Sequence, residues 1–461
     1  MLTSSRGRAI ETLGVSLVAK EKAVGVGLIG FGTIGTGVVK VLRGNADVIE
    51  RRLGFPLRLV RVADLDLQTD RGVDLEGVRF DSDSDALIED PEVDIVIELI
   101  GGYEVAKRMI LRSIEAGKHV VTANKALLAL HGKDIFEAAR KRGVDVAFEA
   151  SVGGGIPILR SLREGLAANR IESVFGIMNG TTNYVLTQME ATGDPFDAVV
   201  KRAQDLGYAE ADPSFDLDGV DAAHKLTLLV AMAFGADLTY KEIATEGIRG
   251  LMPVDFSAAD EFGYRIKLLG IAKTHRGSDG EESIEARVHP TLVPKSSLLA
   301  NVDGAMNAIA VSGDAVGPTL FYGAGAGEMP TASAVVGDLI EIAREVRRGI
   351  SGRVAPLSYL PHELVSRPIM PVGEIVGRSY LRFSALDRPG ALAHITGILG
   401  EHEIGIESVN QSGQGGDGES VPVLMQTDPV KESVLREALE EIERLSDLSA
   451  PIRLIRIEEG I

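Results

Sequence analysis

Residues 24–148 alternate between β-prone runs and helical segments, and this alternation limits the fold more than any other feature of the sequence. Strands and helices in strict turn predict an α/β fold with a parallel, doubly wound sheet, because helices are the usual connections between parallel strands. Such a sheet binds its ligands at the carboxyl ends of its strands. The predicted strands are 24–28, 57–63, 93–99, 119–122 and 144–148, and the predicted helices are 34–53, 103–116 and 133–141.

A glycine-rich turn with the pattern G-x-G-x-x-G follows the first predicted strand and precedes the first predicted helix. The first glycine permits the tight turn, and the second lets the backbone approach a pyrophosphate. The third lets the helix pack on the strand, so that the helix N-terminus faces the phosphates. The sequence therefore predicts a dinucleotide site formed by Gly30, Phe31, Gly32, Thr33, Ile34 and Gly35.

Other residues at strand ends extend this predicted cofactor site. Asp64 follows the second strand, where a carboxylate binds ribose hydroxyls but repels a 2′-phosphate, so we expect NAD(H) to be preferred over NADP(H). Arg61 or Arg71 could reach such a phosphate, and use of both cofactors stays open. The other candidates, which follow the third and fourth strands, are Ile100, Gly101 and Lys125.

An acidic stretch over 206–225 ends in a single lysine, Lys225. Asp218 is predicted as the N-cap of a helix that ends at Gly235, and Asp221 and Lys225 lie one turn apart on one face of it. A capped helix with a surface ion pair would explain these residues. It would not explain the other acids of the loop, which are Glu210, Asp212 and Asp216, so a structural role and a functional role stay open on spacing alone.

A second loop, over 148–157, follows the last predicted strand of the sheet. Glu149 precedes three consecutive glycines, and Pro157 suits the first turn of a helix. Bare carbonyl groups beside a carboxylate can hold a hard cation. A tight turn with a solvated acid is the alternative.

Beyond residue 170 the pattern changes to a mixed α+β arrangement. A second glycine turn at 322–327 could close over a cofactor or cap the helix predicted over 332–348. A proline-rich linker follows, and the predicted order after it is β-α-β-β-α-β, which is a ferredoxin-like unit.

Composition excludes several classes of protein. A net charge of −19 argues against nucleic acid or an anionic membrane as a partner, and the absence of cysteine excludes thiolate chemistry. No apolar run is long enough to span a bilayer. Residues 1–21 are interpreted as a loose arm without a secretory signal, so we expect a cytoplasmic protein.

Together these motifs resemble homoserine dehydrogenases that carry a C-terminal ACT domain. The resemblance rests on GFGTIGTG at 30–37, VTANKALLA at 121–129, FEASVGGGIP at 148–157, GYAEADPSFDLDGVDAAHK at 207–225, YGAGAGEMPTASAVVGD at 322–338 and DRPGALAHI at 387–395. It implies a Rossmann-type domain over 22–150, an α+β catalytic and dimerisation domain over 151–330 and a helix returning to the nucleotide domain over 331–350. The resemblance further implies a linker over 351–377 and a regulatory ACT domain over 378–458.

The resemblance also implies a role for particular residues in the interconversion of L-homoserine and L-aspartate 4-semialdehyde. Lys225 would donate and accept the proton, with Asp221 as its partner. The substrate-binding residues would be Glu210, Asp216 and Lys125, and further cofactor contacts would come from Gly207, Gly325 and Gly327. A monovalent cation, Na⁺ or K⁺, would be held by the Glu149 carboxylate and the backbone of Val152, Gly154 and Ile156.

Threonine is the implied effector, and a homodimer or homotetramer is the implied assembly. Two alternatives compete with this interpretation. One is a different dehydrogenase that shares only the nucleotide-binding domain, which the acidic motif ending in Lys225 disfavours. The other is an amino-acid-sensing regulatory protein with an inactive dehydrogenase body.

Overall fold

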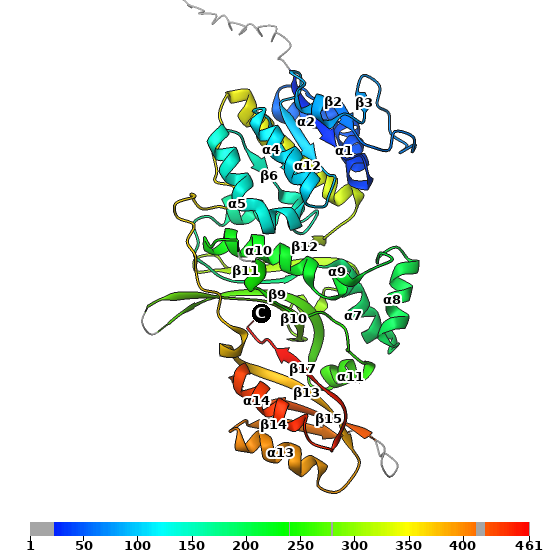
Figure 1. Cartoon of the computed structure of the whole chain (residues 1–461), viewed down its shortest axis with the longest axis vertical. Helices are drawn as coiled ribbons and strands as arrows, with labels where there is room; N and C mark the ends of the chain where they lie inside the picture. Colours follow the sequence, from blue (N-terminus) through cyan, green and yellow to red (C-terminus); the bar gives the residue numbers. More distant parts are fainter. Residues whose placement is uncertain (1–22, 239, 278–279, 412–419, 461) are drawn as a thin grey trace, which may run out of the picture.

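The computed structural model describes residues 23–238, 240–277, 280–411 and 420–460. The arm predicted over 1–21 lies outside these residues. Figure 1 shows three bodies that follow one another along the long axis of the molecule. The first carries α1, α2, α4, α5 and α12, the second carries α7 to α11, and the third carries α13 and α14.

The first body is a six-stranded sheet in the order β3-β2-β1-β4-β5-β6, and all its neighbouring strands are parallel. Every residue of β1 and β4 is buried, as parallel strands covered on both faces require. The strand order reverses between β1 and β4, so their carboxyl ends form the crevice expected for a ligand, and the predicted doubly wound sheet is confirmed. The strands are β1 (Val24–Ile29), β2 (Leu57–Ala63), β3 (Arg79–Asp81), β4 (Ile95–Glu98), β5 (His119–Thr122) and β6 (Val146–Ala147).

The helices of this body differ in part from the prediction. The segment 34–53 forms two helices, α1 (Thr33–Gly44) and α2 (Ala46–Leu53), because Asn45 between them has non-helical backbone angles. The last helix, α5 (Lys125–Arg142), begins earlier than predicted, since the Asn124 side chain caps it by accepting a bond from the Leu127 N–H at 3.1 Å. The remaining helices are α3 (Ser84–Ile88) and α4 (Glu104–Glu115). Helix α3 and strand β3 were not predicted, because segments this short show no clear periodicity.

A long helix far along the sequence completes the first body. Helix α12 (Glu328–Arg348) follows the second body in sequence but lies beside α1 in Figure 1. Its buried side chains, such as Val335 and Leu339, share one apolar core with Val26 and Leu28 of β1. The chain therefore leaves the first body after β6, builds the second body, and returns to the first through α12.

The second body is built on an antiparallel sheet in the order β12-β11-β7-β9-β10. Helix α10 (Val220–Phe234) is buried from Asp221 to Phe234. Neighbouring side chains therefore surround the helix and fix the positions of its polar residues. The strands are β7 (Ile171–Ile177), β8 (Ala244–Thr245), β9 (Tyr264–Arg276), β10 (Glu282–Pro294), β11 (Met306–Gly313) and β12 (Gly317–Ala324). The helices are α6 (Ile158–Arg160), α7 (Gly180–Thr192), α8 (Phe196–Asp205), α9 (Ser214–Leu217), α10 and α11 (Pro253–Glu261).

The third body has the predicted ferredoxin-like order of elements. Its sheet has the order β17-β13-β15-β14, and the short strand β16 pairs with β13. The outer strand β17 also pairs in parallel with β10 of the second body, through Thr291 with Arg456 and Leu292 with Ile457. The elements are β13 (Val376–Leu386), α13 (Ala391–Glu401), β14 (Ile406–Gln411), β15 (Ser420–Thr427), β16 (Val430–Lys431), α14 (Glu432–Ile442) and β17 (Leu448–Ile457).

The proline-rich segment over 351–377 packs against the second body. Val365 and Ile369 form isolated β-bridges with Ala236 and Ile284, and Leu357 is buried. This segment therefore connects the third body to the second by β-bridges and apolar packing as well as by the covalent chain. In the described ranges, no helix combines the length and apolar character needed to cross a membrane.

Candidate active site

The centre of the site is a carboxylate shared by two lysines. Lys225 Nζ donates to Asp221 Oδ2 at 2.7 Å and to the Met178 carbonyl at 2.6 Å. Lys125 Nζ lies 3.0 Å from Asp221 Oδ1. Asp221 and Lys225 come from the buried helix α10 of the second body, whereas Lys125 begins α5 of the first. The predicted pair on one helix face is present, and the fold adds a third member from the other body.

Burial and neighbouring charge act in opposite directions on these three groups. Burial alone would raise the pKa of Asp221, but the ammonium groups of Lys225 and Lys125 outweigh it and hold that pKa well below the usual range. Burial lowers the pKa of Lys225, against the pull of Asp221 and with a further contribution from Lys125. Burial would also lower the pKa of Lys125, but Asp221 outweighs it and the pKa of Lys125 is raised. Two lysines on one carboxylate thus have pKa values shifted in opposite directions.

Asn179 connects this centre to a second acid. Its amide Nδ2 donates to Asp221 Oδ2 at 2.9 Å and to Asp216 Oδ1 at 2.7 Å, while its Oδ1 accepts the Thr182 N–H at 2.9 Å and caps α7. Glu210 lies on the exposed loop after α8, and its charge contributes to the raised pKa of Lys125. Asp216 therefore reaches the lysine centre through Asn179, and Glu210 is near enough for its charge to act on Lys125. Asn179 carried no sequence signal beyond its place after a strand and before a helix.

The acids of the loop divide into two groups, and one prediction is wrong. Asp218 does not cap α10: Gly219 precedes the helix with φ of 81°, a left-handed conformation that suits glycine, and Asp218 instead pairs with Arg249 Nε at 2.6 Å. Asp212 accepts the Ser214 N–H at 3.1 Å and stabilises the turn into α9. These two acids stabilise the loop, whereas Asp216 and Glu210 are the acids whose charges act on Lys125.

A cleft of about 420 Å³ lies where the first and second bodies meet, beside Lys125. It is lined from the first body by the turn after β4 and the turn after β5, and from the second by Phe215, whose ring centroid is 6.0 Å from Lys125 Nζ. Of the residues predicted to contact the cofactor, the cleft contains Ile34, Gly101 and Lys125.

Glu98 at the end of β4 is a cleft residue that sequence reasoning missed. Its carboxyl group accepts the Thr122 hydroxyl at 2.7 Å and the Ile100 N–H at 2.8 Å, and thereby joins the ends of β4 and β5. Burial raises its pKa despite these bonds. The only available signal was an acid that ends a buried strand, which is easily taken for a solvated residue.

The glycine turn has the geometry that dinucleotide binding requires. A Cβ on Gly30, which has φ of 98°, would lie 2.6 Å from the Leu99 backbone, and one on Gly35 would lie 2.3 Å from the Gly30 carbonyl oxygen. Among the residues that the structure describes, no neighbouring atom lies within 4 Å of a Cβ built on Gly32, so a pyrophosphate could approach its backbone. The residues of the turn therefore fit a dinucleotide at the N-terminus of α1.

Asp64 lies at the turn and accepts the Phe31 N–H at 2.5 Å. Arg71 packs on Phe31, with the guanidinium carbon 4.8 Å from the ring centroid, and donates to the carbonyls of Thr69 and Asp66 at 2.8 and 3.0 Å. Arg61 points to Asp81, which is 2.7 Å away. Both arginines thus have partners within the protein.

The remaining predicted cofactor glycines lie in two other loops. Gly207, with φ of 77°, follows the C-cap of α8 on the exposed loop that leads to Glu210. Gly325 packs against the other glycine loop, because a Cβ on Gly154 would lie 2.4 Å from the Gly325 carbonyl oxygen. Gly327 directly precedes α12 with φ of 124°. The second glycine turn therefore starts α12 and packs against the loop after Glu149.

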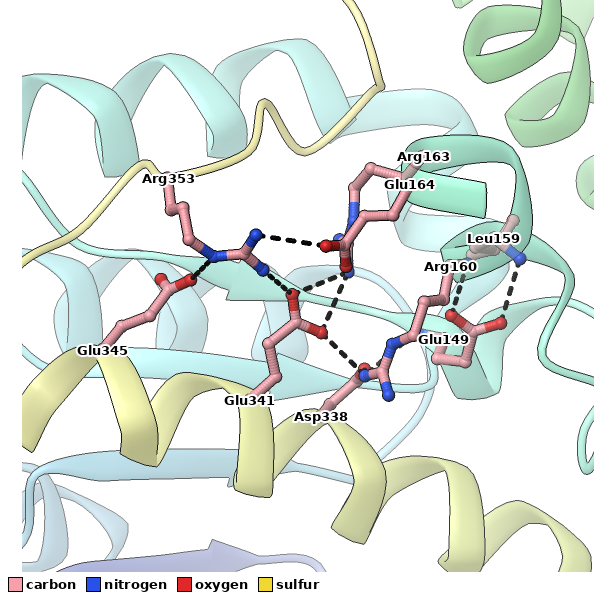
Figure 2. Close-up of polar contacts among 9 residues, drawn as sticks. All are labelled: Glu149, Leu159, Arg160, Arg163, Glu164, Asp338, Glu341, Glu345 and Arg353. Carbon is pink, nitrogen blue, oxygen red and sulfur yellow. Dashed lines mark hydrogen bonds and ion pairs between the residues drawn. The ribbon is translucent and has the colours of Figure 1, made fainter. Parts of the chain in front are cut away.

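The Glu149 loop lies in a network of charged side chains shown in Figure 2. The Glu149 carboxylate accepts the Leu159 and Arg160 N–H groups at 2.9 and 2.8 Å, and the Glu149 N–H donates to Asp338 at 2.8 Å. Burial, together with the Glu149 charge, raises the pKa of Asp338 to about 8. Arg353, at the start of the linker, reaches the same network through Glu341 and Glu345 of α12 at 3.2 and 3.0 Å.

These contacts define how a cation could be held in this loop. Each Glu149 oxygen accepts one backbone N–H and keeps a further lone pair, so it can still serve as a ligand. Within the described ranges no group of three or more His, Cys, Asp or Glu side chains could hold a metal ion. A cation here would depend mainly on backbone carbonyl groups, of the kind offered by Val152, Gly154 and Ile156.

A parallel sheet with a dinucleotide turn, facing a buried lysine–aspartate centre, defines an NAD(P)-dependent oxidoreductase. Family models agree with this class over three ranges. The homoserine dehydrogenase NAD binding domain matches residues 30–149, homoserine dehydrogenase matches 157–340 and the ACT domain matches 379–447. The chain belongs to the homoserine dehydrogenase family.

Full-length relatives bear out this membership. The homoserine dehydrogenases of Neisseria gonorrhoeae and Pseudomonas aeruginosa are 47% and 46% identical, each over 95% of this chain and 99% of the relative. A crystal structure of a homoserine dehydrogenase from Thiobacillus denitrificans is 48% identical with a TM-score of 0.88, and covers 95% of this chain and 99% of its own. The alternative of an amino-acid sensor with an inactive dehydrogenase body is not supported.

Proposed function

We propose that the chain interconverts L-homoserine and L-aspartate 4-semialdehyde, with Lys225 as the general acid and base. The observation that carries this proposal is the Asp221 carboxylate, which holds Lys225 at 2.7 Å and Lys125 at 3.0 Å. Paired titratable groups whose pKa values are pushed apart indicate which one transfers a proton. Lys225, with the lowered pKa, transfers the proton, and Lys125, with the raised pKa, stays charged.

The proton step follows from this division of roles. When bound, the reduced nicotinamide supplies the hydride that forms the new C–H bond at the aldehyde carbon. The carbonyl oxygen then gains negative charge, and the Lys225 ammonium gives it a proton while Asp221 and the Met178 carbonyl hold the nitrogen in place. Lys125 remains an ammonium and stabilises the same oxygen. In the oxidative direction Lys225 takes the hydroxyl proton.

The acids beside the lysines suit a zwitterionic substrate. Asp216 and Glu210 face the centre from the loop before α10 and can pair with the substrate ammonium. The test is the formation of reduced nucleotide from L-homoserine, with D-homoserine as the control. Activity with L-homoserine alone is expected. A protein that binds the nucleotide but oxidises neither enantiomer would contradict the proposal.

The cofactor proposed is NAD(H) in preference to NADP(H). Asp64 lies beside the turn, and the arginines that could attract a 2′-phosphate are engaged: Arg61 with Asp81, and Arg71 with the Phe31 ring and backbone carbonyls. The test compares kcat/KM for NADH and NADPH in wild type and in Ala63→Arg. Wild type should favour NADH and the variant should shift toward NADPH. A wild-type preference for NADPH would reverse the assignment.

The Glu149 loop is proposed to hold a monovalent cation, Na⁺ or K⁺. The proposal is supported by the free lone pairs of Glu149 and by the glycines that bare the backbone of the loop. Activity should then depend on Na⁺ or K⁺ at constant ionic strength. Equal rates in a buffer whose only cation is a bulky organic ammonium would refute the site.

The ferredoxin-like body is proposed to bind an effector, with L-threonine as the candidate. The body contains neither lysine of the centre, but it is joined to the second body through β17 and the packed linker. L-Threonine should inhibit the full chain and D-threonine should not. The full chain is the right material, because truncation at residue 353 would remove the buried Leu357 from the second body.

A homodimer or homotetramer is the proposed assembly. It is supported by β12, an edge strand of the long sheet on which Tyr322 is 58% exposed and Leu320 is 37% exposed. Light scattering on the purified chain distinguishes the two assemblies, and a monomer at working concentration would exclude both.

A further inference from the structure

A series of buried hydrogen bonds lies beside the cleft and runs from the end of β4 to the first residue of α5. It begins at Glu98, which is 1% exposed. Glu98 Oε1 accepts the Ile100 and Gly101 N–H groups at 2.8 and 3.3 Å. Glu98 Oε2 accepts the Thr122 hydroxyl at 2.7 Å. One carboxyl group therefore holds the turn after β4 with one oxygen and the end of β5 with the other.

The hydrogen bonds continue from Thr122 to the cap of α5. The hydroxyl oxygen of the buried Thr122 accepts the Asn124 N–H at 3.1 Å. Asn124 caps α5 by accepting the Leu127 N–H at 3.1 Å, and its amide nitrogen donates to the Gly102 carbonyl at 2.7 Å. The residue after this cap is Lys125, which begins α5. The turn after β4 and the start of α5 are therefore held together by one set of bonds.

The position of Lys125 depends on where α5 begins. The Lys125 side chain is 31% exposed, so its neighbours enclose it less than they enclose Lys225, whose side chain is 10% exposed. Its ammonium nevertheless lies 3.0 Å from Asp221 Oδ1, on helix α10 of the other body. Helix α5 lies next to α10 in Figure 1 and shares an apolar core with it. The backbone at the start of α5 therefore contributes much of the precision of this contact.

We propose that Glu98 is a positioning residue for the reaction. Together with Thr122 and Asn124 it forms a set of hydrogen bonds, the strand-end relay, that fixes the start of α5. The relay thereby places the Lys125 ammonium on the Asp221 carboxylate, where the proposed mechanism needs it to stabilise the substrate oxygen. The inference rests on the proposed function and adds to it a residue that acts through Lys125.

The role depends on the reach of the Glu98 side chain and not on its charge. Its two oxygens bond to donors at different strand ends, and a shorter acid cannot contact both. Burial raises the pKa of Glu98 against three hydrogen bonds, and among the described residues no cation contributes to that shift. Asp221, by contrast, contacts two ammonium groups at 2.7 and 3.0 Å. An acid placed for its charge would have such partners, so Glu98 is placed for its hydrogen bonds.

Four variants separate reach from charge. Glu98→Gln keeps the length and loses the charge: its amide oxygen can accept the N–H groups of the turn while its amide nitrogen donates to the Thr122 oxygen. Glu98→Asp keeps the charge but is shorter by one methylene group. Thr122→Ser keeps the hydroxyl, and Thr122→Val removes it at nearly the same size. The matched control is Thr227→Val, since Thr227 is also buried and its hydroxyl donates to the Ala223 carbonyl at 2.8 Å within α10.

The first measurement follows the Lys125 amine itself. Each protein is treated with acetic anhydride at about pH 8, and acetylation of Lys125 is quantified by mass spectrometry of its peptides. An amine reacts in its neutral form, and Asp221 raises the pKa of Lys125, so the wild-type amine should react slowly. Glu98→Asp and Thr122→Val should speed its labelling by roughly fivefold or more. Glu98→Gln, Thr122→Ser and the control should stay within about twofold, and Lys133, 78% exposed on the same helix, should label equally in all.

The second measurement is homoserine oxidation. Displacement of a positioned group by about 1 Å can cost about 10² in rate, so kcat should fall roughly tenfold or more in Glu98→Asp and Thr122→Val. The Lys125 charge lowers the pKa of Lys225, so a displaced Lys125 lets that pKa rise. Lys225 acts as a base in this direction, and the rise of kcat with pH should therefore move to higher pH in the same two variants. A loss of stability alone would not move this profile.

The two measurements also keep the two proposals apart. If wild type oxidises no homoserine, the proposed reaction fails, and the labelling of Lys125 still decides the role of Glu98. Faster labelling in Glu98→Gln than in Glu98→Asp would show that charge matters, and would overturn the strand-end relay. Wild-type labelling of Lys125 in Thr122→Val would overturn it as well, and this variant decides alone if Glu98→Asp does not fold.

Discussion

Asp221 and Asp338 are both buried aspartates beside basic side chains, and their pKa values are shifted in opposite directions. Asp221 lies in contact with two ammonium groups, at 2.7 and 3.0 Å, and its pKa is held well below the usual range. Asp338 has a guanidinium of Arg160 at 3.4 Å, and that arginine is also engaged by Glu341 at 2.7 Å. The pKa of Asp338 is raised to about 8 by burial and by Glu149.

The difference shows that burial does not by itself set the charge of an acid. What decides is whether a cation lies in contact and whether other acids compete for it. At the lysine centre two cations share one carboxylate, and the acid is a fixed anion that can orient an ammonium. In the network of Figure 2 five acids share three arginines, and the pKa of the innermost acid, Asp338, is raised to about 8.

The largest expected effect comes from removing the proton donor at the lysine centre. Lys225→Met keeps the apolar stem but removes the ammonium, and kcat should fall by roughly 10²–10⁴, the span of a positioned general acid. Nucleotide binding, followed by fluorescence titration, should be unchanged. The matched control is Lys267→Met, since Lys267 is also buried but bonds to the Val302 carbonyl at 2.7 Å, and the kcat of this variant should persist. A near wild-type kcat in Lys225→Met would remove Lys225 from the mechanism.

Removing the shared anion should have the next largest effect. Asp221→Asn leaves the buried Lys225 ammonium facing the half-buried ammonium of Lys125, and breaking a buried ion pair costs about 3–5 kcal/mol of unfolding free energy. The pKa of Lys225 should fall further, so the alkaline limb of the kcat profile for aldehyde reduction should move to lower pH. Urea unfolding and a pH series of kcat check the two effects. An unmoved alkaline limb would mean that Asp221 does not govern the charge of Lys225.

The pH dependence of stability tests the surroundings of the same centre through His224. Burial, against the pull of Asp221, lowers the pKa of His224 from 6.5 to about 4. Between these values the unfolded chain binds a proton that the folded chain does not, so stability falls as the pH falls, by up to about 1.4 kcal/mol per unit. His224→Phe keeps a ring stacked on Tyr240 and should flatten urea-derived stability between pH 6.5 and pH 4. An unchanged slope would assign the pH dependence to other groups.

The smallest effect is expected from the other buried aspartate. In Asp338→Asn the amide oxygen can still accept the Glu149 N–H, and a neutral group replaces an acid that is largely neutral at pH 7. The unfolding free energy at that pH should change by about 1 kcal/mol or less. A loss as large as that of Asp221→Asn would show that Asp338 is ionised and that the contrast between the two sites is false.

Several features of the site followed from short-range pattern alone. The glycine turn after β1 and the pairing of Asp221 with Lys225 depend on residues a few positions apart, and both were predictable. The contact of Lys125 with Asp221 was not, because it joins two bodies that are far apart in the sequence. The prediction that Asp218 caps α10 is wrong for a local reason. Gly219 has a left-handed conformation and separates α9 from α10, and the Asp218 carboxylate pairs with Arg249 instead.

The sequence by itself determined the parallel sheet, the dinucleotide turn, the lysine–aspartate spacing and the ferredoxin-like order of the last body. Backbone preference and side-chain periodicity act between near neighbours, and the sequence displays them directly. Only the tertiary structure decided that Lys125 joins the centre, that burial beside Glu149 raises the pKa of Asp338, and that β17 continues the sheet of β10. Electrostatic energies depend on which groups lie within a few ångströms, and that proximity is created by folding.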